Sequence, residues 1–224
     1  MSGKGVRPRL MAIHDGLLAH FGPRGWWPGE SPFEVMVGAV LTQHTSWKNV
    51  ERAISNLKAL GLTSPEAIMK AGEPGLLGAL KPSGYYNLKA KRLRALCAMA
   101  LSHGKGGLRP KVLELPLEEL RGALLAVKGV GPETADSIAL YAAGHPSFVV
   151  DAYTRRLLLR HGLMEGDPPY EDIRAWFMEK LPNDAALFNE FHALIVAVGH
   201  HFCGPMAPQC GLCPLGSDPH LILS

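Results

Sequence analysis

The sequence predicts an all-α protein, and two observations support that prediction. Ser31-Pro32 and Ser64-Pro65 each place a capping serine before a proline that suits the first helical turn. Between residues 187 and 198, apolar side chains recur at the spacing of a helix. The one β-like run, residues 147–151, is too short to indicate a sheet. We therefore expect roughly ten helices joined by short glycine and proline turns.

Taken in chain order, the first start signal leads into a helical segment at 33–43. The second leads into residues 66–71, which Gly72 closes. Residues 86–104 are typical of an amphipathic helix with a basic face, and residues 104–110 of an exposed loop.

Length and composition bound the possible classes of function. The 224 residues allow one large domain or two small ones, and 47% hydrophobic residues suffice for a core. A net charge of +3 and a pI of about 8.7 exclude an acidic protein and permit a polyanionic partner. No run of roughly 18 apolar residues predicts a membrane span, and residues 1–17 do not resemble a secretory signal. We expect a cytoplasmic, reducing setting, where cysteine clusters more often bind metals than form disulfides.

Two glycines one residue apart separate two apolar runs. A helix is expected to reach Val127, turn through residues 128–131 and restart at Pro132. Backbone N–H groups at such a turn suit an anion. A dinucleotide site is excluded because no strand precedes the glycines and no third glycine follows, and the Gly-Lys-Ser/Thr of a Walker loop is absent. Taken alone, the turn would favour a plain helix–turn–helix corner, because such corners are common.

The turn does not stand alone. The run "LLAVKGVGPETAD", followed about twenty residues later by "VVDAYTRR", resembles the helix-hairpin-helix and Gly/Pro…Asp signature of the endonuclease III superfamily of DNA glycosylases. The resemblance extends from about Trp26 to Pro214. It implies that the backbone of Gly129, Val130 and Gly131 holds a DNA phosphate, with Lys128 as a further phosphate contact.

The resemblance also implies two helical domains. One is a six-helix barrel at residues 31–146, which carries the hairpin at about 117–144. The other combines residues 1–30 with 147–224 and includes an iron–sulfur loop at 203–220.

By position, Asp151 corresponds to the essential aspartate of the family. Cleavage of an N-glycosidic bond builds positive charge on the sugar, and a fixed carboxylate stabilises that charge or positions water. Asp151 is also suited to cap the following helix, and the two roles can coexist. Family members that cut the strand carry at position 133 a lysine that forms a Schiff base. Glu133 cannot do so, which implies base removal without strand cleavage.

An aromatic segment suggests where a base would bind. "WWP", "LTQHT", "KPSGYYNLKAKRL" and the glycine turn are similar to the 3-methyladenine DNA glycosylase III branch of the superfamily. By position, Trp26, Trp27 and Trp47 would form the base pocket, although single aromatic residues more often belong to a core. Gln43 would enter the duplex and fill the vacated stack. A cationic methylated purine suits such a pocket through cation–π attraction.

Three cysteines stand where the superfamily has four. Cys203, Cys210 and Cys213 match its [4Fe–4S] ligand spacing, but the fourth position is Pro219. Three alternatives stay open: a cluster with Asp218 or His220 as fourth ligand, a zinc ion held with His200 or His201, or a relic without metal. Of these the spacing favours the cluster, in a structural role. Cys97 is expected to be a buried apolar residue.

These features together predict a monomeric, monofunctional DNA glycosylase that acts on alkylated purines in double-stranded DNA. The alternatives are a glycosylase for pyrimidine lesions or mismatched adenine, and a DNA-binding homologue with little or no catalysis.

Overall fold

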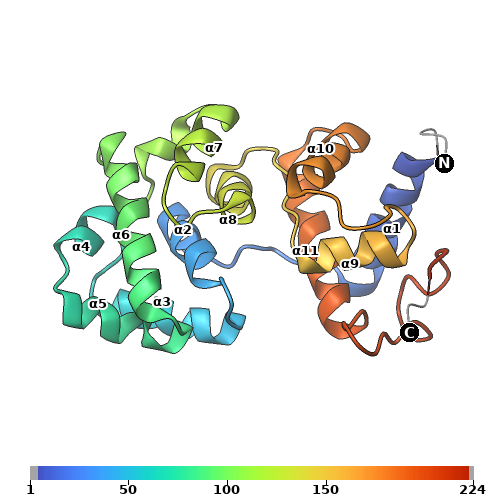
Figure 1. Cartoon of the computed structure of the whole chain (residues 1–224), viewed down its shortest axis with the longest axis horizontal. Helices are drawn as coiled ribbons and strands as arrows, with labels where there is room; N and C mark the ends of the chain where they lie inside the picture. The colour runs from blue at the N-terminus through green and yellow to red at the C-terminus, as the bar shows by residue number, and fades with distance from the viewer. Residues whose placement is uncertain (1–4, 222–224) are drawn as a thin grey trace. The chain divides into compact units, whose positions relative to one another are not determined.

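The computed structural model describes residues 5–221. Residues 1–4 and 222–224, which the expected domain ranges include, lie outside that part. Within it the chain is helical with no strand, which confirms the all-α prediction (Figure 1). Residues 147–150, part of the β-like run, have no regular secondary structure. The chain divides into two compact units, Trp27–His145 and Met1–Trp26 with Pro146–Ser224.

The unit Trp27–His145 is built from short helices and single turns. They are α2 (Pro32–Leu41), α3 (Trp47–Ala59), α4 (Pro65–Lys70), α5 (Glu73–Leu80), η1 (Lys81–Ser83), α6 (Tyr86–Ser102), η2 (Lys111–Glu114), α7 (Leu117–Leu125), α8 (Pro132–Ser137) and the π-helical η3 (Ile138–Ala143). Both predicted start signals are confirmed. The Ser31 hydroxyl accepts a hydrogen bond from the N–H of Glu34, and the Ser64 hydroxyl accepts one from the N–H of Ala67.

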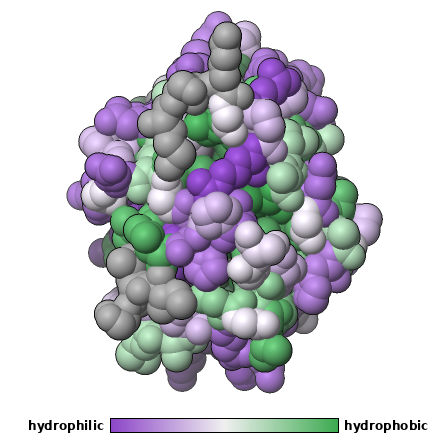
Figure 2. All heavy atoms as spheres, turned by 90° about the vertical axis from the view of Figure 1, so that its right-hand side faces the viewer, coloured by the Kyte–Doolittle hydropathy of each residue, from purple (hydrophilic) through white to green (hydrophobic). Residues whose placement is uncertain are grey.

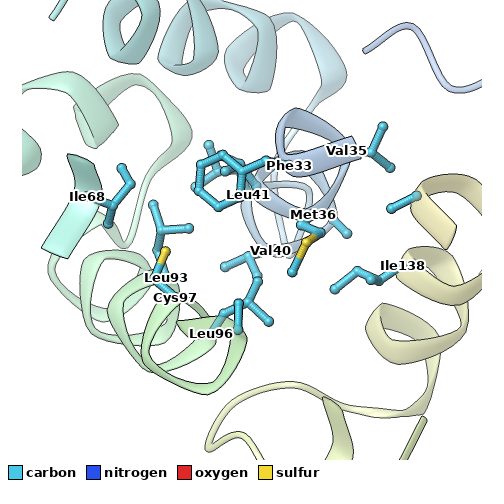
Figure 3. Packing of buried hydrophobic residues seen from close by; sticks show 14 of the residues in the cluster. Phe33, Val35, Met36, Val40, Leu41, Ile68, Leu93, Leu96, Cys97 and Ile138 are labelled. Atoms are coloured by element: carbon cyan, nitrogen blue, oxygen red, sulfur yellow. The ribbon is translucent and has the colours of Figure 1, made fainter. Parts of the chain in front are cut away.

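Helix α2 lies at the centre of this unit because it is apolar on nearly all sides. Eight of its ten residues are buried, which is the pattern of a core helix rather than a surface helix. It packs against α3, α6 and η3, and Figure 3 shows Met36 and Val40 of α2 among Leu93 and Leu96 of α6 and Ile138 of η3. Burial on several sides fixes where both ends of α2 lie.

Helix α6 presents one buried amine to the end of α2. Lys89 is 1% exposed, and its Nζ donates hydrogen bonds to the carbonyls of Leu41 (2.9 Å) and Ser83 (2.6 Å). Burial, followed by the nearby charge of Arg92, lowers the pKa of Lys89. The amine ties the C-terminal end of α2 to α6, and the loop that begins there, residues 42–46, starts from a fixed point. Cys97 lies eight residues further along α6. It is fully buried as expected, and burial raises its pKa to about 12.

The second unit combines α1 (Val6–Phe21), α9 (Ala152–Arg160), α10 (Tyr170–Lys180) and α11 (Ala185–His201) with the cysteine loop. Its core is aromatic: Phe148 and Phe177 stack with ring centroids 3.8 Å apart, and Phe188 meets Phe148 edge-on. Figure 2 shows one face on which hydrophobic residues reach the surface among hydrophilic ones. No helix within residues 5–221 has the length and apolar character needed to cross a membrane.

Candidate functional site

The glycine turn joins α7 to α8 as a helical hairpin. Gly129 has a φ of +94°, a conformation that side chains rarely adopt, and an added Cβ would lie 2.6 Å from the side chain of Arg92. Gly131 precedes α8, and Pro132 occupies the first helical position as predicted. Lys128 and Gly129 are exposed, whereas the Val130 side chain is buried. Glycine is therefore required at 129 both by backbone conformation and by close packing.

A buried ion pair holds the two helices of the hairpin together. Arg121 of α7 donates to both carboxylate oxygens of Asp136 in α8, at 3.0 and 3.3 Å, and Asp136 is fully buried. Two parallel hydrogen bonds of this kind set orientation as well as distance. The ion pair therefore fixes the two helices that flank the glycine turn.

Gln43 lies against this turn. Its Nε2 donates to the carbonyl of Gly129 (3.2 Å) and to the Thr134 hydroxyl (3.0 Å), while its Oε1 accepts from Nη1 of Arg92. These bonds join the 42–46 loop, α6 and the hairpin. Val130 N–H donates within the turn to the Val127 carbonyl at 3.0 Å. The side chain of Gln43 therefore links the 42–46 loop to the hairpin.

The residue after Gln43 stands in a strained conformation. His44 is exposed and has a φ of +55°, which is uncommon for any residue other than glycine. Such strain persists only where surrounding structure imposes it, and it gathers at functional sites. Here the anchored neighbours, Leu41 bound by Lys89 and Gln43 bound by the hairpin, impose it.

Two of the three predicted pocket tryptophans come together in the Trp27–His145 unit. The rings of Trp27 and Trp47 meet edge-on with centroids 5.3 Å apart, and Tyr141 of η3 lies 5.4 Å from Trp27. A Cβ on Gly38 of α2 would approach the Trp27 indole to 2.9 Å, so glycine there makes room for the ring. Trp27 and Tyr141 also line an open hollow of about 670 Å³ together with Arg109.

Trp26 belongs by its contacts to the other unit, so the predicted trio is divided between the two. Tyr141 was not predicted as part of the aromatic group. It lies in an apolar run, where an aromatic residue is indistinguishable by sequence from a core residue.

Asp151 stands at the start of α9 and caps it. Its Oδ1 accepts the Thr154 N–H at 2.7 Å, and its side chain is 14% exposed. Its Oδ2 lies 3.7 Å from Nε2 of His192 in α11, itself 8% exposed at the side chain. Burial alone would raise the pKa of Asp151, but the nearby imidazole of His192 and the hydrogen bond from the Thr154 N–H outweigh it and hold that pKa below its ordinary value. The carboxylate is therefore ionised and fixed in direction.

Sequence reasoning missed His192, Arg92 and Thr134. His192 lies within the apolar helical pattern of residues 187–198, where a single histidine is usually a satisfied core residue. Arg92 is one of several basic residues on α6, and nothing in their spacing distinguishes it. Glu133 is exposed in the first turn of α8, next to the glycine turn.

The three clustered cysteines line one partly open cavity in the terminal unit, together with Arg160, His161 and His220. All three are free thiols, and Nη1 of Arg160 donates to Sγ of Cys203 at 3.1 Å. Burial, followed by the neighbouring thiols, raises the pKa of Cys213 despite a backbone hydrogen bond. His200 and His201 are exposed at the end of α11 and do not line this cavity.

This donor set fits a cluster better than a single ion. Within residues 5–221, no three His, Cys, Asp or Glu side chains converge closely enough to hold one metal ion. In a [4Fe–4S] cluster each thiolate binds a different iron, so the ligands surround a cavity instead of meeting at a point. Three thiols around one cavity match that requirement.

Comparison with known proteins agrees with the fold. Residues 37–183 match the model of the HhH-GPD superfamily of base excision DNA repair proteins. A Methanocaldococcus jannaschii protein provisionally named a DNA repair glycosylase is 43% identical over 92% of this chain and 93% of its own. Endonuclease III of Thermotoga maritima is 31% identical over 81% of this chain and 79% of its own.

Among solved structures, the Helicobacter pylori 3-methyladenine DNA glycosylase bound to 1,N6-ethenoadenine superimposes with a TM-score of 0.73. It is 29% identical and covers 87% of this chain and 97% of its own. These findings confirm the predicted superfamily. The chain belongs to the HhH-GPD superfamily of base excision DNA repair proteins and is a DNA glycosylase.

Proposed function

We propose that this glycosylase is monofunctional and removes alkylated purines from double-stranded DNA. The observation that supports this most is the ionised Asp151, held by the Thr154 N–H and His192, in a chain with glutamate at position 133. The carboxylate stabilises positive charge on the deoxyribose, and no lysine stands ready at 133 to form a covalent intermediate.

The reaction breaks the bond between C1′ and the base nitrogen, and the departing base keeps the electron pair. A base alkylated to a cation leaves as a neutral molecule, so it needs no proton from the enzyme. Water then adds to C1′ and gives up one proton to Asp151 or to solvent, which leaves an abasic site. Because Asp151 is fixed by its cap, it opposes the developing charge without reorganising.

Aromatic rings account for the preference for a cationic purine. Trp27, Trp47 and Tyr141 form one group of aromatic rings in the Trp27–His145 unit. A cation over such rings gains roughly 1–2 kcal/mol when it is dry. The bound base in the Helicobacter pylori relative, 1,N6-ethenoadenine, is likewise a modified purine.

The hairpin is proposed to hold a DNA phosphate through the exposed backbone at Gly129 and Gly131, with Lys128 beside it. Val130 contributes through packing, because its side chain is buried and its N–H donates to Val127. Such phosphate contacts position the protein without reading sequence.

The 42–46 loop is proposed to fill the stack that the extruded base leaves. Gln43 is the residue that position predicts, but it would have to give up three hydrogen bonds, each worth about 0.5–1.5 kcal/mol. His44 is exposed, planar and already in a strained conformation beside the hairpin. We therefore assign the insertion to His44 and treat Gln43 as the residue that positions it.

The cysteine cavity is proposed to hold a [4Fe–4S] cluster in a structural role. Cys203, Cys210 and Cys213 would bind it, and its bound state would order the C-terminal segment. We also propose a reducing, cytoplasmic setting, which keeps these thiols free, and a monomeric state.

A panel of duplexes tests the function, each carrying 3-methyladenine, 1,N6-ethenoadenine, an oxidised pyrimidine or adenine opposite guanine. Release of free alkylated base without strand cleavage supports the proposal. Release of oxidised pyrimidine or mismatched adenine in its place would assign another substrate class. Tight binding of abasic duplex with no release from any lesion would identify a DNA-binding homologue.

A further inference from the structure

A histidine side chain also lines the cysteine cavity. Cys203, Cys210 and Cys213 share the lining of the cavity with His220, which follows Pro219 directly in the chain. Proline has no side-chain ligand atom, so position 219 cannot itself supply a fourth side-chain ligand.

Asp218, the other neighbour of Pro219, is already engaged. Its two carboxylate oxygens accept hydrogen bonds from Nε and Nη2 of Arg9, at 3.0 and 2.7 Å, and Oδ2 also accepts from Nδ1 of His161 at 2.6 Å. The residue borders a separate hollow and does not line the cysteine cavity. Its carboxylate is therefore a tether to α1 and α9.

The backbone on both sides of His220 is held in place. Nη2 of Arg9 donates to the Pro219 carbonyl at 2.6 Å, and the Leu221 N–H donates to the Arg160 carbonyl at 2.6 Å. These bonds fasten residues 218–221 against α1 and the end of α9. His220 is thereby directed to the cavity by contacts that the imidazole does not itself make.

A backbone carbonyl orients the ring of His220. Its Nδ1 lies 2.7 Å from the Asp218 carbonyl. A carbonyl can only accept, so Nδ1 is the donor in this contact, and Nε2 is the nitrogen left to face a metal. A backbone carbonyl on one ring nitrogen is the usual way in which proteins orient the other nitrogen toward a metal.

From this geometry we propose that Nε2 of His220 is the fourth ligand of the cluster, in place of the absent thiolate. The inference rests on the cluster proposed above but not on any catalytic step. It also predicts a property of the cluster, because replacing thiolate by neutral imidazole removes one negative charge and raises the reduction potential.

His161 is the competing donor, since it also lines the cavity and its Nδ1 donates to Asp218. It lies at the end of α9, where its own carbonyl accepts a hydrogen bond from Arg9 at 2.7 Å. His220 belongs to the loop that carries the thiols, and for that reason we assign the bond to it.

The test uses anaerobically purified protein in which histidine alone is labelled with ¹⁵N. Pulsed EPR of the reduced cluster should detect a ¹⁵N coupling in the wild type. In His220→Ala the coupling should vanish, with loss of about a quarter of the iron. In His220→Cys the coupling should vanish while the iron is retained and the reduction potential falls. His161→Ala, Asp218→Asn and the exposed-residue control His200→Ala should keep the coupling.

A coupling that survives in both His220 variants would overturn the proposal, as would its loss in His161→Ala alone. An iron-loaded wild type without any ¹⁵N coupling would also overturn it. Iron-free protein that still releases base would refute the cluster and the ligand while leaving the glycosylase proposal intact. Base release is measured on the same preparations, so failure of the two proposals is distinguishable.

Discussion

Nε2 of His192 lies 3.7 Å from Oδ2 of Asp151, the carboxylate oxygen that does not accept the capping hydrogen bond. One oxygen of Asp151 accordingly serves the local structure and the other faces a partner from a different helix. The acid proposed as catalytic is thus also a capping residue, and its ionisation depends on a residue 41 positions away (151 to 192).

Asp151→Asn should abolish base release while leaving DNA affinity and folding intact. Asparagine retains a side-chain oxygen for the Thr154 N–H, and it is as good a helix cap as aspartate. The negative charge is lost, and with it the stabilisation of the sugar cation. Single-turnover release and binding to abasic duplex measure the two effects. Full activity in this variant would remove Asp151 from the mechanism.

His192→Gln should move the acid limb of the pH–rate profile to higher pH. In the wild type His192 helps to hold the pKa of Asp151 below its ordinary value, so activity falls only at low pH. Without the imidazole, burial dominates and raises that pKa. By the same linkage, the stability that Asp151 contributes is present above its unfolded pKa and is lost as pH falls through its folded pKa. His200→Gln is the matched control, and an acid limb common to both variants would refute the coupling.

Glu133→Lys should introduce strand cleavage. The residue is exposed at the first turn of α8, so substitution should not disturb the core. A lysine there supplies the amine that forms a Schiff base with C1′, which borohydride traps as a protein–DNA adduct. Glu133→Gln is the control and should give no adduct. Equal trapping by the wild type would show that another amine acts as nucleophile and that the enzyme is a lyase.

His44→Ala should reduce base release from lesions in duplex DNA far more than from the same lesion in single-stranded DNA. A single strand has no duplex stack to fill, so an inserting residue contributes nothing there. Gln43→Ala should slow both substrates alike, because it loosens the loop from Gly129 and Thr134. If Gln43→Ala shows the selective loss and His44→Ala does not, the insertion belongs to Gln43.

Asp136→Asn should lower the free energy of unfolding by about 3–5 kcal/mol, because it leaves Arg121 without its buried counter-charge. Urea titration measures the change. The exposed pair Lys111–Glu114 provides the control: Glu114→Gln should cost less than about 1 kcal/mol. Equal effects of the two substitutions would show that the ion pair does not hold the hairpin together.

Local signals in the sequence were sufficient for much of this protein. The serine–proline pairs located the starts of α2 and α4, and the Gly-x-Gly-Pro run located the hairpin, because caps and turns depend on residues three or four positions apart. The resemblance of the hairpin, Asp151 and the cysteine spacing to one superfamily then predicted the enzyme class, which the comparisons confirmed.

Tertiary structure decided which side chains act together. His192 lies beside Asp151, and Arg92 donates a hydrogen bond to Gln43. Arg9 binds the carboxylate of Asp218, and of the two neighbours of Pro219 only His220 lines the cysteine cavity. Each of these pairs joins segments far apart in the chain, and their residue types are common on helices of any function. Packing of one helix against another determines such meetings, and packing depends on the summed contacts of the whole core. The spacing of residues within one segment therefore does not predict which distant side chains will meet.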